Sequence, residues 1–191
     1  MRAETLDGLM VLTPRVFEDE RGCFWESFNQ RRFAEAVGRE VAFIQDNHSV
    51  SRRHVIRGLH FQAGQPQAKL VRVAFGLIFD VTVDLRPESP TFGRWTGMEL
   101  SAADRRQLWV PEGLAHGFLA LSEWAEVAYK VNAPYAPDCE RTLRWDDPAV
   151  GVAWPLPPGV EPILSAKDRQ GRDFAESSQA HAVNSRTTAQ T

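Results

Sequence analysis

The feature that most limits the fold of this chain is a long series of short strand-like runs. In the clearest run, every second residue from Leu77 to Leu85 is large and apolar, and Asp80, Thr82 and Asp84 stand between them. This period of two is typical of a strand with one face in a core. Similar runs, separated by Gly, Pro, Ser or Asp, lie at 9–14, 23–28, 43–51, 54–61, 69–75, 94–100, 107–110, 117–121 and 125–131. So many short strands predict an all-β sandwich or barrel.

Helix signals are fewer and shorter. Residues 29–37 have the features of a short helix, with Asn29 at the N-cap position and Gly38 as the stop. Ser165 and Asp168 have the spacing of a capping box, which marks a helix start. We therefore expect a few short helices at the periphery. We also expect one domain over 1–175 and a polar, disordered tail over 176–191.

Composition excludes several classes of protein. With 191 residues, 43% of them hydrophobic, the chain can bury the core of one domain. The formal net charge is −3 and the arginine pairs are scattered, so we expect no nucleic-acid surface. The start lacks a secretory pattern, and no apolar run approaches the roughly 20 residues of a membrane helix. Two cysteines are too few for a disulfide framework, so we expect a cytoplasmic protein.

Common nucleotide, nucleophile and metal motifs are missing from the sequence. Neither GxGxxG nor GxxxxGK followed by Ser or Thr occurs, and no GxSxG elbow is present. His54 and His60 are six residues apart, so they share a strand face without forming the close pair that a strand usually offers a metal. We therefore expect no metal site.

Several polar side chains stand in strand-like runs where packing alone would favour aliphatic residues. They are Gln45, Asp46, Asn47, His48, Arg57, His60 and Lys69. Burying charge is costly, so such positions need an explanation. Taken singly, His60 is explained as a hydrogen-bonded histidine and Lys69 as a strand-end residue at the surface.

Other polar residues also allow an ordinary interpretation. Tyr129 shares a strand face with Val127 and Val131, as a core tyrosine would if its hydroxyl found a partner. Caps, turns and strand ends explain a further set, namely Asp168, His116, Arg21, Glu26 and Glu140.

Taken together, eleven short motifs resemble the dTDP-4-dehydrorhamnose 3,5-epimerase family. They are DERG at 19–22, QDNHS at 45–49, RGLHFQ at 57–62, KLVR at 69–72, DVTVDLR at 80–86, SPTFG at 89–93, LWVP at 108–111, AHGF at 115–118, YK at 129–130, WDDP at 145–148 and LSAKD at 164–168. The resemblance covers nearly the whole chain up to about residue 170. Two departures are Phe61, where the family commonly has a tyrosine, and a slightly shortened segment at 63–68.

The resemblance implies a fold, an assembly and a reaction. The fold would be an all-β, cupin-like jelly-roll sandwich or barrel, present as a homodimer and needing neither metal nor organic cofactor. The substrate would be a dTDP-4-keto-6-deoxy-hexose, dTDP-4-dehydro-6-deoxy-D-glucose, inverted at carbons 3 and 5 to dTDP-4-dehydro-L-rhamnose in dTDP-rhamnose biosynthesis. Three alternatives stay open: an epimerase acting at one carbon, a metal-dependent cupin, and a non-catalytic sugar-binding jelly roll.

The same resemblance implies catalytic roles, with His60 as the base and Tyr129 as the acid on the opposite face of the sugar ring. Both carbons flank the ketone at carbon 4, so loss of either proton leaves a charge that delocalises onto the ketone oxygen. No hydride carrier is therefore required. Asp168 would orient the histidine, and Lys69 would lie near the developing oxyanion.

The nucleotide would be held by side chains, because the usual phosphate loops are missing. The planar fork of arginine suits a pyrophosphate. The substrate-binding residues implied by the resemblance are Arg21, Phe24, Glu26, Gln45, Asp46, Asn47, Arg57, His116, Glu140 and Lys167. One difficulty is that a regular pleat places Arg57 and His60 on opposite faces unless Gly58 introduces a bulge.

Overall fold

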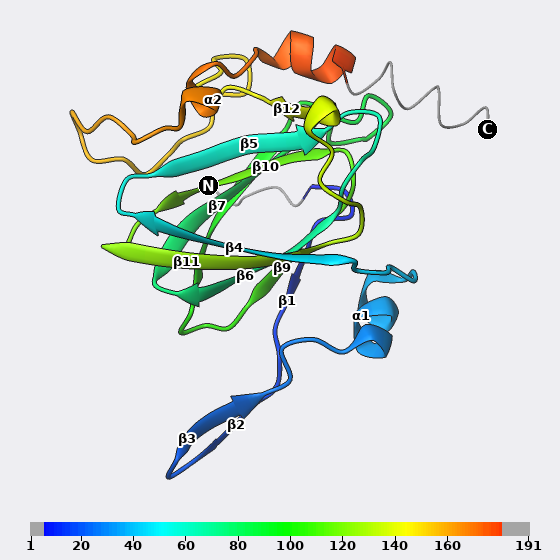
Figure 1. The fold of residues 1–191 in the computed structure, drawn as a ribbon, viewed down its shortest axis with the longest axis vertical. Helices are drawn as coiled ribbons and strands as arrows, with labels where there is room; N and C mark the ends of the chain where they lie inside the picture. Colours follow the sequence, from blue (N-terminus) through cyan, green and yellow to red (C-terminus); the bar gives the residue numbers. More distant parts are fainter. Residues whose placement is uncertain (1–5, 181–191) are drawn as a thin grey trace.

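The computed structural model describes residues 6–180, which are built mainly from two antiparallel sheets. The sheets face each other as a sandwich (Figure 1). In the described part, the first sheet has the order β1 (Met10–Leu12), β9 (Gln107–Val110), β6 (Lys69–Phe75), β11 (Trp124–Val131), β4 (Gln45–Arg52). The second has the order β12 (Glu140–Thr142), β5 (Ile56–Gln62), β10 (Leu114–Ala120), β7 (Leu77–Asp84), β8 (Trp95–Ser101). This architecture confirms the predicted all-β, cupin-like jelly roll.

Each strand-like run of the sequence overlaps an observed strand, and β6 and β9 have the predicted bounds. The predicted runs omit two short strands, β2 (Val16–Asp19) and β12. Explaining Glu140 as part of a surface turn is wrong, because it begins β12 and lies opposite Gln62 of β5. A strand of three residues is too short for its alternation to show in the sequence.

The main core fills the space between the sheets. Val71 of β6 and Val127 of β11 pack there against Ile78 of β7. The opposite face of β7 is buried too, because Val81 packs with Leu143 and other apolar residues of the C-terminal part of the chain. Both faces of β7 are therefore enclosed, whereas the alternation predicted only one buried face.

The helix α1 (Gln30–Val37) covers part of the outer face of the first sheet (Figure 1). As predicted, the side chain of Asn29 caps it by accepting the Arg32 N–H at 3.2 Å. Gly38 ends it in the left-handed conformation, at φ 75°, which favours glycine. The ring of Phe33 packs edge-on against Trp109 of β9, with 5.1 Å between centroids.

The C-terminal part of the chain crosses the outer face of the second sheet. A short 3-10 helix, η1 (Pro137–Cys139), precedes β12, and α2 (Ala166–Arg169) begins at the predicted cap, Ser165. Residues 174–180 are helical and Ser177 is buried, so the expected disordered tail does not begin at 176. The physical reason is that Phe174 and Ala180 pack against that sheet's outer core. The rest of the expected tail, 181–191, lies outside the described residues.

A hairpin formed by β2 and β3 (Gly22–Trp25) projects away from the sandwich (Figure 1). Phe17 and Phe24 on this hairpin are exposed, and Phe24 keeps 71% of its surface accessible. The two rings are cross-strand partners, and exposed apolar side chains grouped in this way are typical of interaction surfaces.

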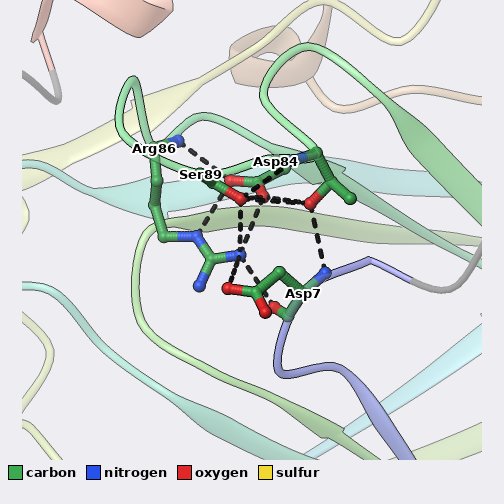
Figure 2. A network of polar contacts seen from close by, with 5 residues as sticks. Asp7, Asp84, Arg86 and Ser89 are labelled. Atoms are coloured by element: carbon green, nitrogen blue, oxygen red, sulfur yellow. Dashed lines mark hydrogen bonds and ion pairs between the residues drawn. The ribbon is translucent and has the colours of Figure 1, made fainter.

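A polar network ties the start of the chain to the connection between β7 and β8 (Figure 2). The fully buried carboxylate of Asp84 accepts hydrogen bonds from Arg86 Nη2 at 2.7 Å and from the Ser89 hydroxyl at 2.5 Å. Arg86 Nη2 also donates to the carbonyl oxygen of Asp7 at 2.8 Å. Burial would raise the pKa of Asp84, but these donors hold it below its ordinary value.

Among the described residues, no helix has the length and apolar character needed to cross a membrane.

Candidate active site

A cavity of about 370 Å³ lies between the two sheets. It is lined by β4, β6 and β11 from the first sheet and by β5, β10 and β12 from the second. Many of the predicted site residues line it, namely Gln45, Asn47, Arg57, His60, Lys69, His116, Tyr129 and Glu140. The fold therefore brings together polar residues that are widely separated in the sequence.

His60 is held by a buried carboxylate. Its Nε2 lies 2.6 Å from Oδ1 of Asp168, whose side chain is only 4% exposed. Asp168 also keeps its capping-box contacts, because its N–H donates to Ser165 Oγ and its Oδ2 accepts from that hydroxyl at 2.8 Å. Asp168 is therefore a helix-capping residue and, at the same time, the partner of His60. Burial would raise the pKa of Asp168, but donors from His60 and Ser165 hold it below its ordinary value.

Lys69 lies at the start of β6 with 8% of its surface exposed, so its explanation as a surface residue is wrong. Its Nζ donates to the carbonyl oxygen of His60 at 3.2 Å. Burial lowers the pKa of Lys69 to about 8, and the charges of Asp80 and Glu140 oppose that shift. An ammonium group with this pKa changes its protonation state near neutral pH.

Tyr129 lies in β11, directly between Asn47 of β4 and Val71 of β6. Its ring belongs partly to the core between the sheets and also lines the cavity. Burial raises the pKa of Tyr129 above its ordinary value, although the nearby guanidinium of Arg57 opposes this shift. The phenol is therefore a weak acid placed in the same cavity as the imidazole of His60.

The local geometry at Gly58 explains how Arg57 and His60 reach one cavity. Gly58 has φ +126°, and a Cβ there would lie 2.6 Å from the Cα of Gly117. The pairing of β5 with β10 shifts register between His116 and Phe118, opposite this glycine. This irregularity breaks the strict alternation of β5. Arg57 and His60 can therefore face the same cavity, although a regular pleat would place them on opposite faces.

Arg57 of β5 is fixed by β4, the edge strand of the other sheet. Its Nε donates to Ser51 Oγ at 2.9 Å and its Nη2 to the carbonyl oxygen of Val50 at 3.1 Å. These bonds orient the guanidinium before any ligand arrives, which suits the recognition of an anion.

The rim of the cavity carries further polar groups. Gln45 Nε2 donates to Asn47 Oδ1 at 2.8 Å, so these two side chains lie together. Glu140 forms an ion pair with Lys167. It also accepts a hydrogen bond from the hydroxyl of Tyr135 at 2.6 Å. Burial would raise the pKa of Glu140, but Lys167 and Tyr135 hold it below its ordinary value.

Tyr135 lines the cavity but was not among the predicted residues. It lies in an irregular segment after β11, where no periodic pattern gives a single residue special weight. The sequence signal that could have found it is a single aromatic residue in a connection made of Asn, Ala and Pro.

His116 lies in β10 and not in a turn, so its explanation as a turn histidine is wrong. It stands directly opposite His60 of β5. Its Nε2 lies 2.9 Å from Oδ2 of Asp80, and both side chains are buried. The cavity therefore contains a second imidazole that is held by a carboxylate.

Asp46 does not face this cavity. It alternates with Gln45 and Asn47 along β4, so its side chain lies on the outer face of the sheet. There it pairs with Nζ of Lys130 at 3.0 Å. The expectation that Gln45, Asp46 and Asn47 all bind one ligand is therefore wrong for Asp46, because strand alternation turns its side chain to the other face of the sheet.

Of the described residues that line this cavity, none comes from the β2–β3 hairpin region. The side chain of Arg21 is 85% exposed and pairs with Asp19, Phe24 is exposed, and Glu26 pairs with Arg32 at 3.1 Å. The reason is that the hairpin points away from the body of the chain that carries it (Figure 1). Within residues 6–180, no group of three or more His, Cys, Asp or Glu side chains is arranged to hold a metal ion.

Comparison with known proteins agrees with the motifs and the fold. The family described as dTDP-4-dehydrorhamnose 3,5-epimerase matches residues 3–176. A dTDP-4-dehydrorhamnose 3,5-epimerase of Salmonella typhimurium is 56% identical over 161 residues, which cover 84% of this chain and 87% of that protein.

Solved structures give the same result. A dTDP-6-deoxy-D-glucose-3,5-epimerase of Legionella pneumophila, in complex with dTDP-4-keto-L-rhamnose, has a TM-score of 0.85 and 44% identity, and the match covers 92% of this chain and 94% of that one. A 3′-monoepimerase of Streptomyces bikiniensis, in complex with dTDP-quinovose, has a TM-score of 0.86 and 31% identity, with 100% and 98% covered. This chain belongs to the dTDP-4-dehydrorhamnose 3,5-epimerase family of isomerases.

Proposed function

We propose that this chain inverts dTDP-4-dehydro-6-deoxy-D-glucose at carbons 3 and 5, giving dTDP-4-dehydro-L-rhamnose for dTDP-rhamnose biosynthesis. The observation that carries the proposal is one cavity that holds the His60–Asp168 pair, the phenol of Tyr129 and the ammonium of Lys69. This set supplies a base, an acid and a cation for an enolate.

The first step is removal of a proton from a carbon next to the ketone. The proton moves to His60, and the C–H electron pair delocalises onto the ketone oxygen to form an enolate. Because Nε2 is bound to Asp168, Nδ1 is the ring nitrogen that takes the proton. The buried carboxylate of Asp168 then stabilises the imidazolium that forms.

The second step delivers a proton to the opposite face of the same carbon. Tyr129 gives up its hydroxyl proton, the enolate collapses to the ketone, and exchange with solvent restores both residues. Lys69 is the donor for the enolate oxygen, and a preorganised donor of this kind contributes about 10²- to 10³-fold to kcat. The reaction moves protons only, so it requires no hydride carrier.

The nucleotide part of the substrate is bound by the other polar residues of the cavity. Arg57, oriented by Ser51, is placed to bind the pyrophosphate. Gln45 and Asn47 offer hydrogen bonds to the base and ribose, and His116, Glu140 and Lys167 contact the sugar side. Tyr135 adds an aromatic ring at the rim.

We also propose that the protein is a homodimer in which the β2–β3 hairpin of one copy reaches the cavity of the other. The proposal explains why Arg21, Phe24 and Glu26 lie away from the cavity of their own chain. It also gives the exposed ring of Phe24 a contact surface. The free thiols of Cys23 and Cys139 agree with a proposed cytoplasmic location.

Complementation tests the shared site. Tyr129→Phe and Arg21→Ala variants are each expected to have low activity alone. In a mixed dimer, the cavity with an intact Tyr129 receives an intact hairpin from the other copy, so activity returns. No recovery in a verified mixed dimer would mean that each chain uses its own hairpin.

Isotope exchange tests the reaction itself. The protein is incubated with the 4-keto nucleotide sugar in deuterium oxide and followed by NMR. Deuterium at carbons 3 and 5 together with the rhamno product is expected. Exchange at carbon 3 alone would identify a single-position epimerase, which is the second candidate because the 3′-monoepimerase of Streptomyces bikiniensis has the same fold. Activity lost on chelation would instead indicate a metal-dependent cupin.

A further inference from the structure

The DVTVDLR motif at 80–86 has a buried acidic residue to which the proposed reaction assigns no role. Asp80 lies on the interior face of β7 with its side chain fully buried. Its Oδ2 is bound to His116, but its Oδ1 has no hydrogen-bond partner among the described residues. A buried carboxylate oxygen without a donor destabilises a fold, so its presence asks for a functional reason.

Asp80 is placed directly behind the cavity. On β10 its cross-strand neighbour is Phe118, and His116 is two residues away on the same face. His116 is in turn opposite His60, so two imidazole–carboxylate pairs stand on adjacent strands, one from each of β5 and β10. His60 has the role of base, which leaves the second pair to be explained.

The hydrogen bond to Asp80 decides which atom His116 presents to the cavity. Nε2 is occupied by the carboxylate, and Nδ1 makes no hydrogen bond with any residue from 6 to 180. With its proton on Nε2, the ring offers the lone pair of Nδ1 as an acceptor for a hydroxyl of the sugar.

The charge of Asp80 also acts on Lys69. Burial lowers the pKa of Lys69, and Asp80 is the larger of the two charges that oppose this shift, the other being Glu140. The titratable or charged side chains that line the cavity around Lys69 are Arg57, His60, His116, Tyr129, Tyr135 and Glu140. Behind this lining, Asp168 holds His60 and Lys167 pairs with Glu140. On the β7 side, the carboxylate behind the lining is that of Asp80, which is bound to His116.

We propose that Asp80 is a positioning residue for the epimerisation, acting through His116, which it orients toward the sugar, and through Lys69, whose ammonium form it favours. It touches neither the substrate nor the reacting carbons. The inference rests on the proposed function and extends it. It states that one buried carboxylate, Asp80, controls the two groups, His116 and Lys69, on the oxyanion side of the cavity.

The substitution Asp80→Asn tests this role, since it keeps the shape of the side chain and removes its charge. kcat is expected to fall about 10- to 100-fold, since the donor at the oxyanion is weakened and not removed. Binding of dTDP, which lacks the sugar, should be unchanged. The fall of kcat/KM with rising pH should move to lower pH, because Lys69 loses a charge that favours its protonated form.

A matched control lies on the same strand. Asp84 is also buried on β7, but it is bound to Arg86 and Ser89 and does not line the cavity. Asp84→Asn should lower stability while leaving the pH profile of the folded enzyme as in the wild type. Asp80→Asn with a wild-type alkaline limb, or an equal shift in Asp84→Asn, would overturn the proposal.

A double mutant separates the two routes of action. If Asp80 acts partly through His116, the Asp80→Asn/His116→Gln double mutant should lose less kcat relative to wild type than the product of the two single losses. If Asp80→Asn does not fold, ¹⁵N NMR of the wild type decides, with His116→Gln assigning the signal. The His116 ring must then carry a proton on Nε2, and a ring protonated on Nδ1 alone would contradict the inference.

Turnover by the wild type in the same assay keeps this test apart from that of the proposed function. If the wild-type enzyme epimerises and Asp80→Asn behaves identically, the role of Asp80 is refuted and the proposed function stands. If the wild-type enzyme does not epimerise, the proposed function itself is refuted.

Discussion

The imidazole of His60 and the carboxylate of Asp168 meet at 2.6 Å although they are 108 positions apart in the chain. The contact joins the middle of β5 to the first turn of α2. The same carboxylate accepts a hydrogen bond from Ser165, so the helix cap fixes the orientation of the group that holds the histidine. Helix capping and the proposed catalysis therefore depend on one side chain.

Asp168→Asn is expected to lower kcat by about 10²- to 10⁴-fold, because an amide leaves the imidazole in the wrong tautomer and without its counter-charge. Steady-state kinetics measures the loss. Asp146→Asn is the control, since Asp146 pairs with Arg144 at the surface of the same C-terminal part of the chain. An Asp168→Asn enzyme with wild-type kcat would reduce Asp168 to a helix cap.

Tyr129→Phe separates the two proton transfers. Without the phenol, inversion should slow by about 10²- to 10⁴-fold, the range for loss of a general acid. His60 still removes and returns protons on its own face, so solvent deuterium should enter the sugar without inversion. NMR of the recovered substrate follows both processes.

Tyr135→Phe is the matched control for that experiment, because it removes a hydroxyl from another tyrosine of the same cavity. It should change affinity more than kcat. A Tyr129→Phe enzyme that inverts the sugar at the wild-type rate would show that another group is the acid.

The pH dependence of the reaction should show the titration of Lys69. Burial lowers the pKa of Lys69 to about 8, so kcat/KM should fall as the pH rises through about 8. Lys69→Arg keeps a cation at all these pH values and should lose this limb, at reduced activity because the geometry differs. A limb near pH 8 that persists in Lys69→Arg would assign the titration to a different group.

The network around Asp84 predicts a stability effect without a catalytic one. Asp84→Asn should lower the free energy of unfolding by about 3 kcal/mol, because Arg86 loses its buried partner. Urea denaturation measures it. Asp104→Asn is the control, because the Asp104–Arg106 pair is partly exposed and is worth under about 1 kcal/mol.

The effect of Asp84→Asn should also depend on pH in one direction. The pKa of Asp84 is lowered in the folded protein, so its contribution is complete above the unfolded pKa and disappears as the pH falls through the folded one. The difference between wild type and variant should therefore shrink in acid. A difference that grows in acid would contradict the assignment.

Local sequence signals determined much of the architecture. Alternation around Leu77–Leu85 located β7, and Asn29 with Gly38 marked the ends of α1, because side-chain period and capping depend on a few neighbouring residues. The motif at 57–62 and the other short motifs likewise indicated the family and its chemistry, since residue types and their order can be read directly from one sequence.

Contacts between distant segments decided the rest. Strand period separates Asp46 from Asn47, but only the packing of the two sheets shows which of them faces the cavity. The irregularity at Gly58 arises from the close approach of Gly117 on another strand. The hairpin that carries Phe24 leaves the body of its own chain, and no local pattern encodes that direction. Sequence by itself specified elements and chemistry, whereas the tertiary structure chose which side chains share a cavity, because that choice is made by strand pairing over long chain distances.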